Sequence, residues 1–114
     1  MITPWADNEI DWSDDKRDLE LHKKQRAERG FSDYDFWSFD TYISAVLANY
    51  AEYAREHNHG YPIGITEQEW DEILEKIQIG FANNAEHSFD DKFKPELLEE
   101  ALTLFAKWFQ NFWD

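Results

Sequence analysis

The sequence predicts an all-α fold: a small helical bundle of three principal helices plus a polar N-terminal helix. Apolar residues recur with a helical period in three long segments, two of which open with capping boxes. The 114 residues are 42% hydrophobic and include 6 Trp, 5 Tyr and 9 Phe, which is enough for the core of one small domain. We divide the chain into an extended acidic arm, residues 1–14, and a single helical domain, residues 15–114.

Charge is distributed unevenly at the start of the chain. Residues 1–15 contain five acids and no base, whereas residues 16–29 contain six of the 11 Lys and Arg residues and only three acids. We expect a polar helix over about residues 15–29. This helix has few apolar anchors and is not stable by itself. Such a helix would lie on the acidic remainder of the chain or become ordered on a partner.

The first principal helix is predicted over residues 33–56. Ser32 and Asp35 form a capping-box pattern at its start. Nine apolar residues share an arc of about 140° and are expected to face the core: Phe36, Phe39, Tyr42, Ile43, Val46, Leu47, Tyr50, Tyr53 and Ala54. The opposite face carries mostly small side chains and one exposed-looking residue, Trp37. That face contacts either a neighbouring helix of the same fold or a partner.

The second principal helix is predicted over residues 67–86, after a capping box formed by Thr66 and Glu69. Five of its apolar residues share one arc and predict its core face: Trp70, Ile73, Leu74, Ile77 and Phe81. Its outward side carries an acidic stripe that includes Asp71, Glu72 and Glu75.

The third principal helix is predicted over residues 95–113, with Pro95 as its first residue. Its apolar residues cover an arc of about 200°, which is wider than packing on one side requires. The aromatic end around Trp108 and Trp113 is therefore either core or a contact with a second chain.

No pattern of catalytic residues occurs in the sequence. The chain has no cysteine, which excludes disulfides and thiol catalysis, and it contains no P-loop, GxSxG, GxGxxG, HExxH or EF-hand motif. His57 with His59, or a cluster of Asp33, Asp35 and Asp40, could in principle bind a metal, but a hydrated loop and helix capping explain most of these residues. Asp40 instead suggests a hydrogen bond to a tryptophan or to a neighbouring backbone. We predict a non-enzymatic protein with no cofactor.

The net charge of −14 restricts the kinds of partner. Nucleic-acid-binding proteins normally carry the opposite balance, so nucleic acid is an unlikely ligand. A basic protein, or a protein groove that normally holds nucleic acid, is the more natural partner, and solubility alone is the other explanation of the charge. The sequence has no apolar run of membrane-spanning length and no secretory signal pattern, so we expect no membrane association.

One segment resembles a known family. Residues 29–43 read RGFSDYDFWSFDTYI, and the later strings NHGYP at 58–62 and EWDEIL at 69–74 extend the likeness to about residues 23–82. This pattern resembles small, uncharacterised acidic proteins of tailed bacteriophages and prophages. The resemblance implies a phage origin and the cytoplasm of the bacterial host, and it brings no catalytic residue with it.

These observations together predict a phage-encoded protein-interaction module. By analogy with other small acidic phage proteins, we expect an inhibitor of a host protein that handles nucleic acid or acts in defence. The alternatives are a homo-oligomeric structural or assembly accessory that uses residues 95–113, and a weak nucleic-acid binder that uses residues 16–29. The predicted binding residues are Trp37, Asp71, Glu72, Glu75, Trp108 and Trp113.

Overall fold

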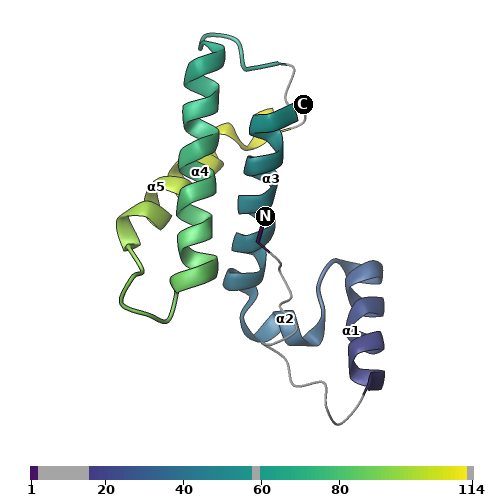
Figure 1. Ribbon diagram of the computed structural model, residues 1–114. Helices are drawn as coiled ribbons and strands as arrows, with labels where there is room; N and C mark the ends of the chain where they lie inside the picture. The colour runs from purple at the N-terminus through teal and green to yellow at the C-terminus, as the bar shows by residue number, and fades with distance from the viewer. Residues whose placement is uncertain (3–15, 58–59, 113–114) are drawn as a thin grey trace.

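The computed structural model describes residues 1–2, 16–57 and 60–112, and these residues form helices joined by turns (Figure 1). Within those ranges no strand occurs, so the all-α prediction is confirmed. The elements are α1 (Lys16–Arg29), α2 (Asp33–Trp37), α3 (Phe39–His57), α4 (Glu67–His87), α5 (Pro95–Trp108) and the 3₁₀ helix η2 (Phe109–Asn111).

The helix α4 packs against both α3 and α5 (Figure 1). It supplies most of the large buried side chains, namely Trp70, Leu74, Ile77 and Phe81. These are four of the five residues predicted for its core face. The fifth, Ile73, is partly buried and packs against the same core. None of the described helices is long and apolar enough to cross a membrane.

The predicted core face of α3 is wrong for its aromatic residues, although Ala54 is buried and Leu47 packs partly buried against the core, as predicted. The buried residues of this helix are the small ones, Ser44, Ala45, Ala48, Ala51 and Ala54, whereas four of the predicted aromatic residues are exposed: Phe36, Phe39, Tyr50 and Tyr53. Small side chains allow α3 to approach α4 closely, and the large residues of α4 fill the space between the two helices. The interpretation of this face as a contact with a neighbouring helix of the same fold is thus confirmed.

The predicted helix over residues 33–56 is broken at Ser38. The backbone there leaves the helical region, with φ −135° and ψ 52°, and the Ser38 amide donates to the carbonyl of Asp35. Neither glycine nor proline marks the break, so the sequence contains no local signal for it. The short helix α2 is instead held by contacts with α1, described below.

The helices α4 and α5 meet at Gly80. A Cβ atom at this position would collide with the Leu97 carbonyl oxygen and the Ala101 side chain, so only glycine allows this approach. Asn83 then holds the connection between the helices, because its side chain donates to the carbonyl of Lys94 (2.9 Å) and accepts from the Lys94 amide (3.0 Å).

The last helix is shorter than predicted. The α-helix ends at Trp108 and a 3₁₀ turn follows, which carries Phe112 into the core beside Trp70 and Tyr50, with ring centroids 5.7 and 5.8 Å apart. Partial burial of Phe112 against both α3 and α4 explains why the regular helix ends before this residue.

Of the predicted acidic arm, the structure describes only Met1 and Ile2. The Ile2 amide donates to Asn49 Oδ1 (2.7 Å), and the Asn49 side chain donates to the Ile2 carbonyl (2.5 Å). The remainder of the arm, residues 3–14, lies outside the described residues.

Candidate functional site

The short helix α2 is fixed in place by a buried ion pair. Asp35 is 2% exposed and accepts two hydrogen bonds from the guanidinium of Arg26 on α1, each 2.8 Å long. Asp35 also completes the predicted capping box: its amide donates to Ser32 Oγ (3.1 Å), and its carboxylate accepts from the Ser32 amide (2.9 Å). One carboxylate therefore both starts α2 and joins it to α1.

A second, exposed set of contacts reinforces this junction. Asp33 accepts from Arg29 (2.6 Å) and from Gln25 (2.9 Å), and its own amide donates to Gln25 Oε1 (2.8 Å). The hydrogen bond from Arg29 is the main reason why the pKa of the Asp33 carboxyl lies below its ordinary value of 3.8, and the bond from Gln25 lowers it further. The polar helix predicted over about residues 15–29 is thus anchored by the side chains of Asp33 and Asp35.

Replacement of Arg29 by Met is expected to raise the pKa of Asp33 toward 3.8, because the largest stabilising contact of the carboxylate is lost. With Arg29 present, the contact stabilises the folded protein above pH 3.8. This stabilisation is lost as the pH falls through the lowered pKa of Asp33. An NMR pH titration of the Asp33 carboxyl measures the change. Lys24→Met, on the same helix, is the control and should leave the titration unaltered. An equal pKa in Arg29→Met and wild type would contradict the assignment.

The helix α2 and the first residue of α3 expose three aromatic side chains close together in the chain, and we call Phe36, Trp37 and Phe39 the aromatic patch. Trp37 is 84% exposed and Phe36 is 67% exposed, and their rings meet edge to face with centroids 6.1 Å apart. Because α2 is held by α1 and by its capping box, these rings project from a fixed backbone. The predicted binding residue Trp37 therefore lies on the surface.

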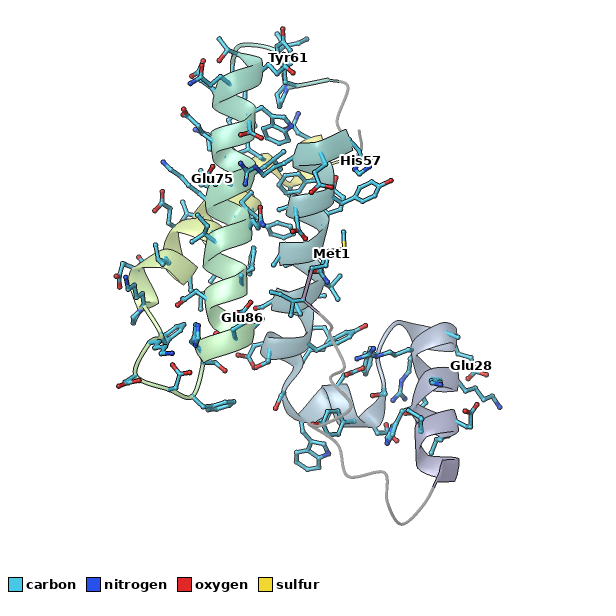
Figure 2. All side chains as sticks on the ribbon, viewed as in Figure 1. Met1, Glu28, His57, Tyr61, Glu75 and Glu86 are labelled. Carbon is cyan, nitrogen blue, oxygen red and sulfur yellow. The ribbon has the colours of Figure 1, made fainter. Side chains whose placement is uncertain are left out.

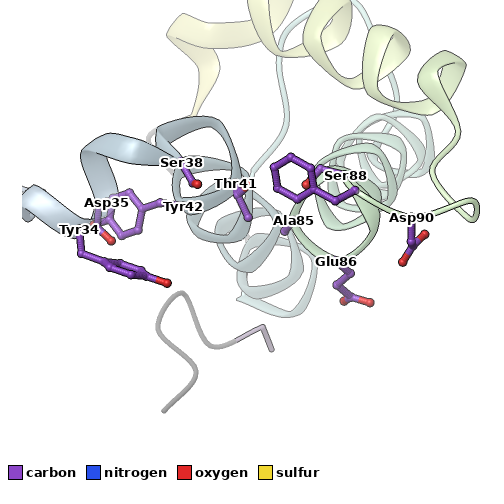
Figure 3. Close-up of a pocket in the computed structure, with 10 residues that line it drawn as sticks. Tyr34, Asp35, Ser38, Thr41, Tyr42, Ala85, Glu86, Ser88 and Asp90 are labelled. Atoms are coloured by element: carbon purple, nitrogen blue, oxygen red, sulfur yellow. The ribbon is translucent and has the colours of Figure 1, made fainter. Parts of the chain in front are cut away.

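A pocket of about 420 Å³ lies between the junction of α2 with α3 and the end of α4 (Figure 3). One side comes from α2 and the first turn of α3, including Tyr34, Ser38 and Tyr42, and the other from the end of α4 and the turn after it, including Glu86 and Phe89. Ser38 lines the pocket and follows Trp37 directly in the chain, so the pocket wall and the aromatic patch are neighbours in sequence. The side chain of Phe89 is 90% exposed.

Sequence reasoning missed this pocket. Residues 87–94 fall between the predicted helices 67–86 and 95–113, and the sequence predicts no site there. The solvent-directed Phe89 within that connection is the one local signal, because an aromatic residue in a polar turn is out of place unless something covers it. The juxtaposition itself depends on how α3 pairs with α4, and Asn84 of α4 reports that pairing through its hydrogen bonds to Ser44 (2.9 Å) and Asp40 (3.3 Å).

The predicted acidic residues lie elsewhere on α4. The Arg55 guanidinium bonds Asp71 through Nε (3.1 Å) and Glu75 through a terminal nitrogen (3.0 Å). The contact with Asp71 raises the pKa of Arg55. Glu72 accepts from Gln68 at 3.4 Å. The acidic stripe is thus partly neutralised by Arg55 of α3.

The stripe and the pocket lie at different levels of α4. In Figure 2, Glu75 is well above Glu86, and the eleven intervening steps correspond to roughly 16 Å of helix. The structure therefore does not join the acidic stripe and the aromatic patch into one small site.

The two predicted tryptophans of the C-terminal segment have different outcomes. Trp108 packs edge to face on Trp70, with ring centroids 5.9 Å apart. It lies partly buried against the core residues Ala54, Trp70 and Leu74. Trp108 therefore stabilises the fold and is not part of the candidate surface. Trp113 lies outside the described residues.

The chemistry of the described residues does not favour a metal centre. Within residues 1–2, 16–57 and 60–112, no group of three or more His, Asp or Glu side chains is placed to hold a metal ion. Asp33 and Asp35 are bound to Arg29 and Arg26, as described above. The suggested pairing of His57 with His59 falls partly outside the described residues.

Comparisons with protein-family models, with curated proteins and with solved structures found no match for this chain.

Proposed function

We propose that this protein is a phage-encoded, non-enzymatic interaction module that binds a basic host protein through the aromatic patch. The observation that carries the proposal is the exposure of Trp37 and Phe36 on a backbone held by buried Asp35. Exposed aromatic side chains on a rigid support are typical anchors of protein interfaces, because they bury much apolar area and lose little conformational entropy.

The charge of the chain supports a basic partner. The net charge is −14, and residues after Gly30 contribute most of it. A surface of this sign accelerates association with a positively charged protein and repels nucleic acid. A host protein with a nucleic-acid-binding groove fits this requirement, and occupation of that groove would inhibit it.

Affinity capture from a bacterial lysate, with and without nuclease, tests the proposal. We expect one dominant host protein that is retained after nuclease treatment and released at high salt. Combined replacement of Trp37 and Phe36 by Ser should reduce its recovery at least about tenfold, since loss of a hot-spot aromatic residue costs about 2 kcal/mol or more.

Tyr61→Ser is the matched control for this experiment. Tyr61 is also an exposed aromatic residue, but it lies at the opposite end of the helices from α2 (Figure 2). Equal recovery with Trp37 and Phe36 replaced would show that the aromatic patch is not the interface.

A separate prediction concerns the acidic stripe. Neutralisation of Asp71, Glu72 and Glu75 to Asn or Gln is expected to slow association with the captured protein and to weaken its dependence on salt. Amide replacements keep hydrogen-bond acceptors near Arg55, which charge reversal would repel. Stopped-flow kinetics at two salt concentrations measure the effect. The same three-charge loss on α5, with Glu96, Glu99 and Glu100 replaced by Gln, is the control. An equal effect of both variants would assign the effect to net charge and remove the stripe from the binding surface.

A second candidate function is a homo-oligomeric structural or assembly accessory. The observation in its favour is a row of exposed apolar residues on the last helical segment, with Leu102 and Phe109 at least half exposed. The molar mass in solution, measured by light scattering at micromolar concentration, separates the two candidates. A strict monomer excludes self-association.

A further inference from the structure

We propose that the pocket beside α2 receives an arginine side chain of the protein partner, so that the aromatic patch and the pocket together recognise an arginine-containing surface. This inference rests on the proposed function and specifies the chemistry of the partner. Its first support is the composition of the pocket wall, which combines aromatic rings with carboxylate and hydroxyl oxygens. A guanidinium group is planar, carries five donors and stacks on aromatic faces, so it suits such a wall.

Three carboxylates line the pocket, those of Asp35, Glu86 and Asp90, and they differ in the contacts they already make. The Glu86 side chain is about half exposed. Among the described residues, it lies within ion-pair distance of His87 Nε2 alone, and that distance, 4.0 Å, is the outer limit of an ion pair. Asp90 also lines the pocket, but it already accepts from His87 Nδ1 (2.9 Å) and from the Lys92 amide (2.8 Å), and these contacts lower its pKa. Glu86 is therefore the carboxylate best able to pair with an incoming cation.

An arginine of the chain itself, Arg26, already contacts an aromatic ring and a carboxylate of the pocket wall. The guanidinium of Arg26 lies 4.4 Å from the centroid of the Tyr42 ring while it makes two hydrogen bonds to Asp35. Tyr42 and Asp35 both line the pocket. An arginine held between a ring and a carboxylate thus already occurs at the pocket edge, and the lining also contains the ring of Phe89 and the carboxylate of Glu86.

An independent observation comes from Thr41, which also lines the pocket. Its hydroxyl oxygen is buried and has no hydrogen-bond partner among the described residues. A buried polar atom without a partner carries a free-energy cost, so a donor that reaches this oxygen is favoured. Guanidinium supplies donors only, so it fits an oxygen that still needs one.

An NMR titration of the ¹⁵N-labelled full chain tests the pocket without any host protein. The probe is N-acetyl-arginine amide at low salt, titrated to about 50 mM because a single anchored side chain gives a millimolar Kd at best. We expect saturable shifts of the amides of Ser38, Thr41, Ala85 and Ser88. N-acetyl-citrulline amide has a similar shape and no charge, and it should shift these amides weakly or not at all.

Two variants locate the contact. Glu86→Gln and Phe89→Ser both alter exposed side chains, and each should weaken the arginine probe about three- to fivefold. Glu99→Gln removes an equal charge from α5 and should leave the affinity unchanged. The inference is overturned if no saturable shift appears, if the citrulline probe binds equally well, or if Glu99→Gln weakens binding as much as Glu86→Gln.

Failure of this inference can be distinguished from failure of the proposed function. If the pocket does not bind arginine, capture of a host protein can still depend on Trp37. If capture does not depend on Trp37, the titration still reports whether the pocket binds the probe.

Discussion

Replacement of Gly80 by Ala should lower the free energy of unfolding by about 2–3 kcal/mol, despite a gain in helix propensity of about 1 kcal/mol. The added methyl group would collide with the Leu97 backbone carbonyl and with Ala101. A backbone carbonyl cannot rotate away as a flexible side chain can, so α5 must shift as a whole. That shift disturbs the shared core of α3, α4 and α5, in which Ala101 is completely buried. Urea denaturation followed by far-UV circular dichroism measures the loss.

Gly60→Ala is the matched control for Gly80→Ala. A Cβ atom at Gly60 meets nothing within 4 Å, and Gly60 does not need a positive φ. Its replacement should therefore change the free energy of unfolding by no more than about 0.5 kcal/mol. Equal stability of the two variants would mean that α5 moves away from α4 at little cost, which would contradict the packing described here.

Replacement of Asp35 by Ala is expected to detach α1 from the remaining helices. The carboxylate is buried and bonds Arg26 and the Ser32 amide, so its removal takes two hydrogen bonds from a partly buried guanidinium and one from the helix start. Breaking such a pair costs about 2–4 kcal/mol, and the lower part of this range applies because Arg26 is partly exposed. The polar helix α1 has no apolar face that would hold it in place otherwise.

Hydrogen exchange followed by mass spectrometry measures this detachment. The amides of α1 should lose protection in Asp35→Ala, whereas those of α4 and α5 should keep it. Glu28→Ala removes an exposed acid from α1 and is the control, with protection expected to resemble that of the wild type. Unchanged protection of α1 in Asp35→Ala would show that the Arg26–Asp35 pair does not hold this helix. A double-mutant cycle with Arg26→Ala then isolates the energy of the pair.

Both capping boxes could be predicted from sequence and are confirmed. Ser32 with Asp35 and Thr66 with Glu69 make the reciprocal hydrogen bonds expected of them. These motifs are local, because the two partners lie three residues apart and need no other part of the fold. The limits of α4 agree to within one residue for the same reason.

The candidate site could be predicted only in part. The small residues opposite the predicted core face drew attention to Trp37, and the structure places Trp37 on the surface. The partial neutralisation of Asp71 and Glu75 could not be predicted, since it depends on Arg55 lying opposite them on a different helix. The pocket depends in the same way on segments about fifty residues apart in the chain.

The sequence by itself determined the helical class, the starts of α2 and α4 and the apolar face of α4, because capping and helical period depend on near neighbours. The tertiary structure alone decided which face of α3 is buried, where α5 ends and why residue 80 is glycine. Periodicity identifies two faces of α3, one aromatic and one of small residues, but the choice between them depends on what the adjacent helix brings. The large side chains of α4 fill the interface, so α3 buries its alanines and its aromatic residues Phe39 and Tyr53 remain at the surface.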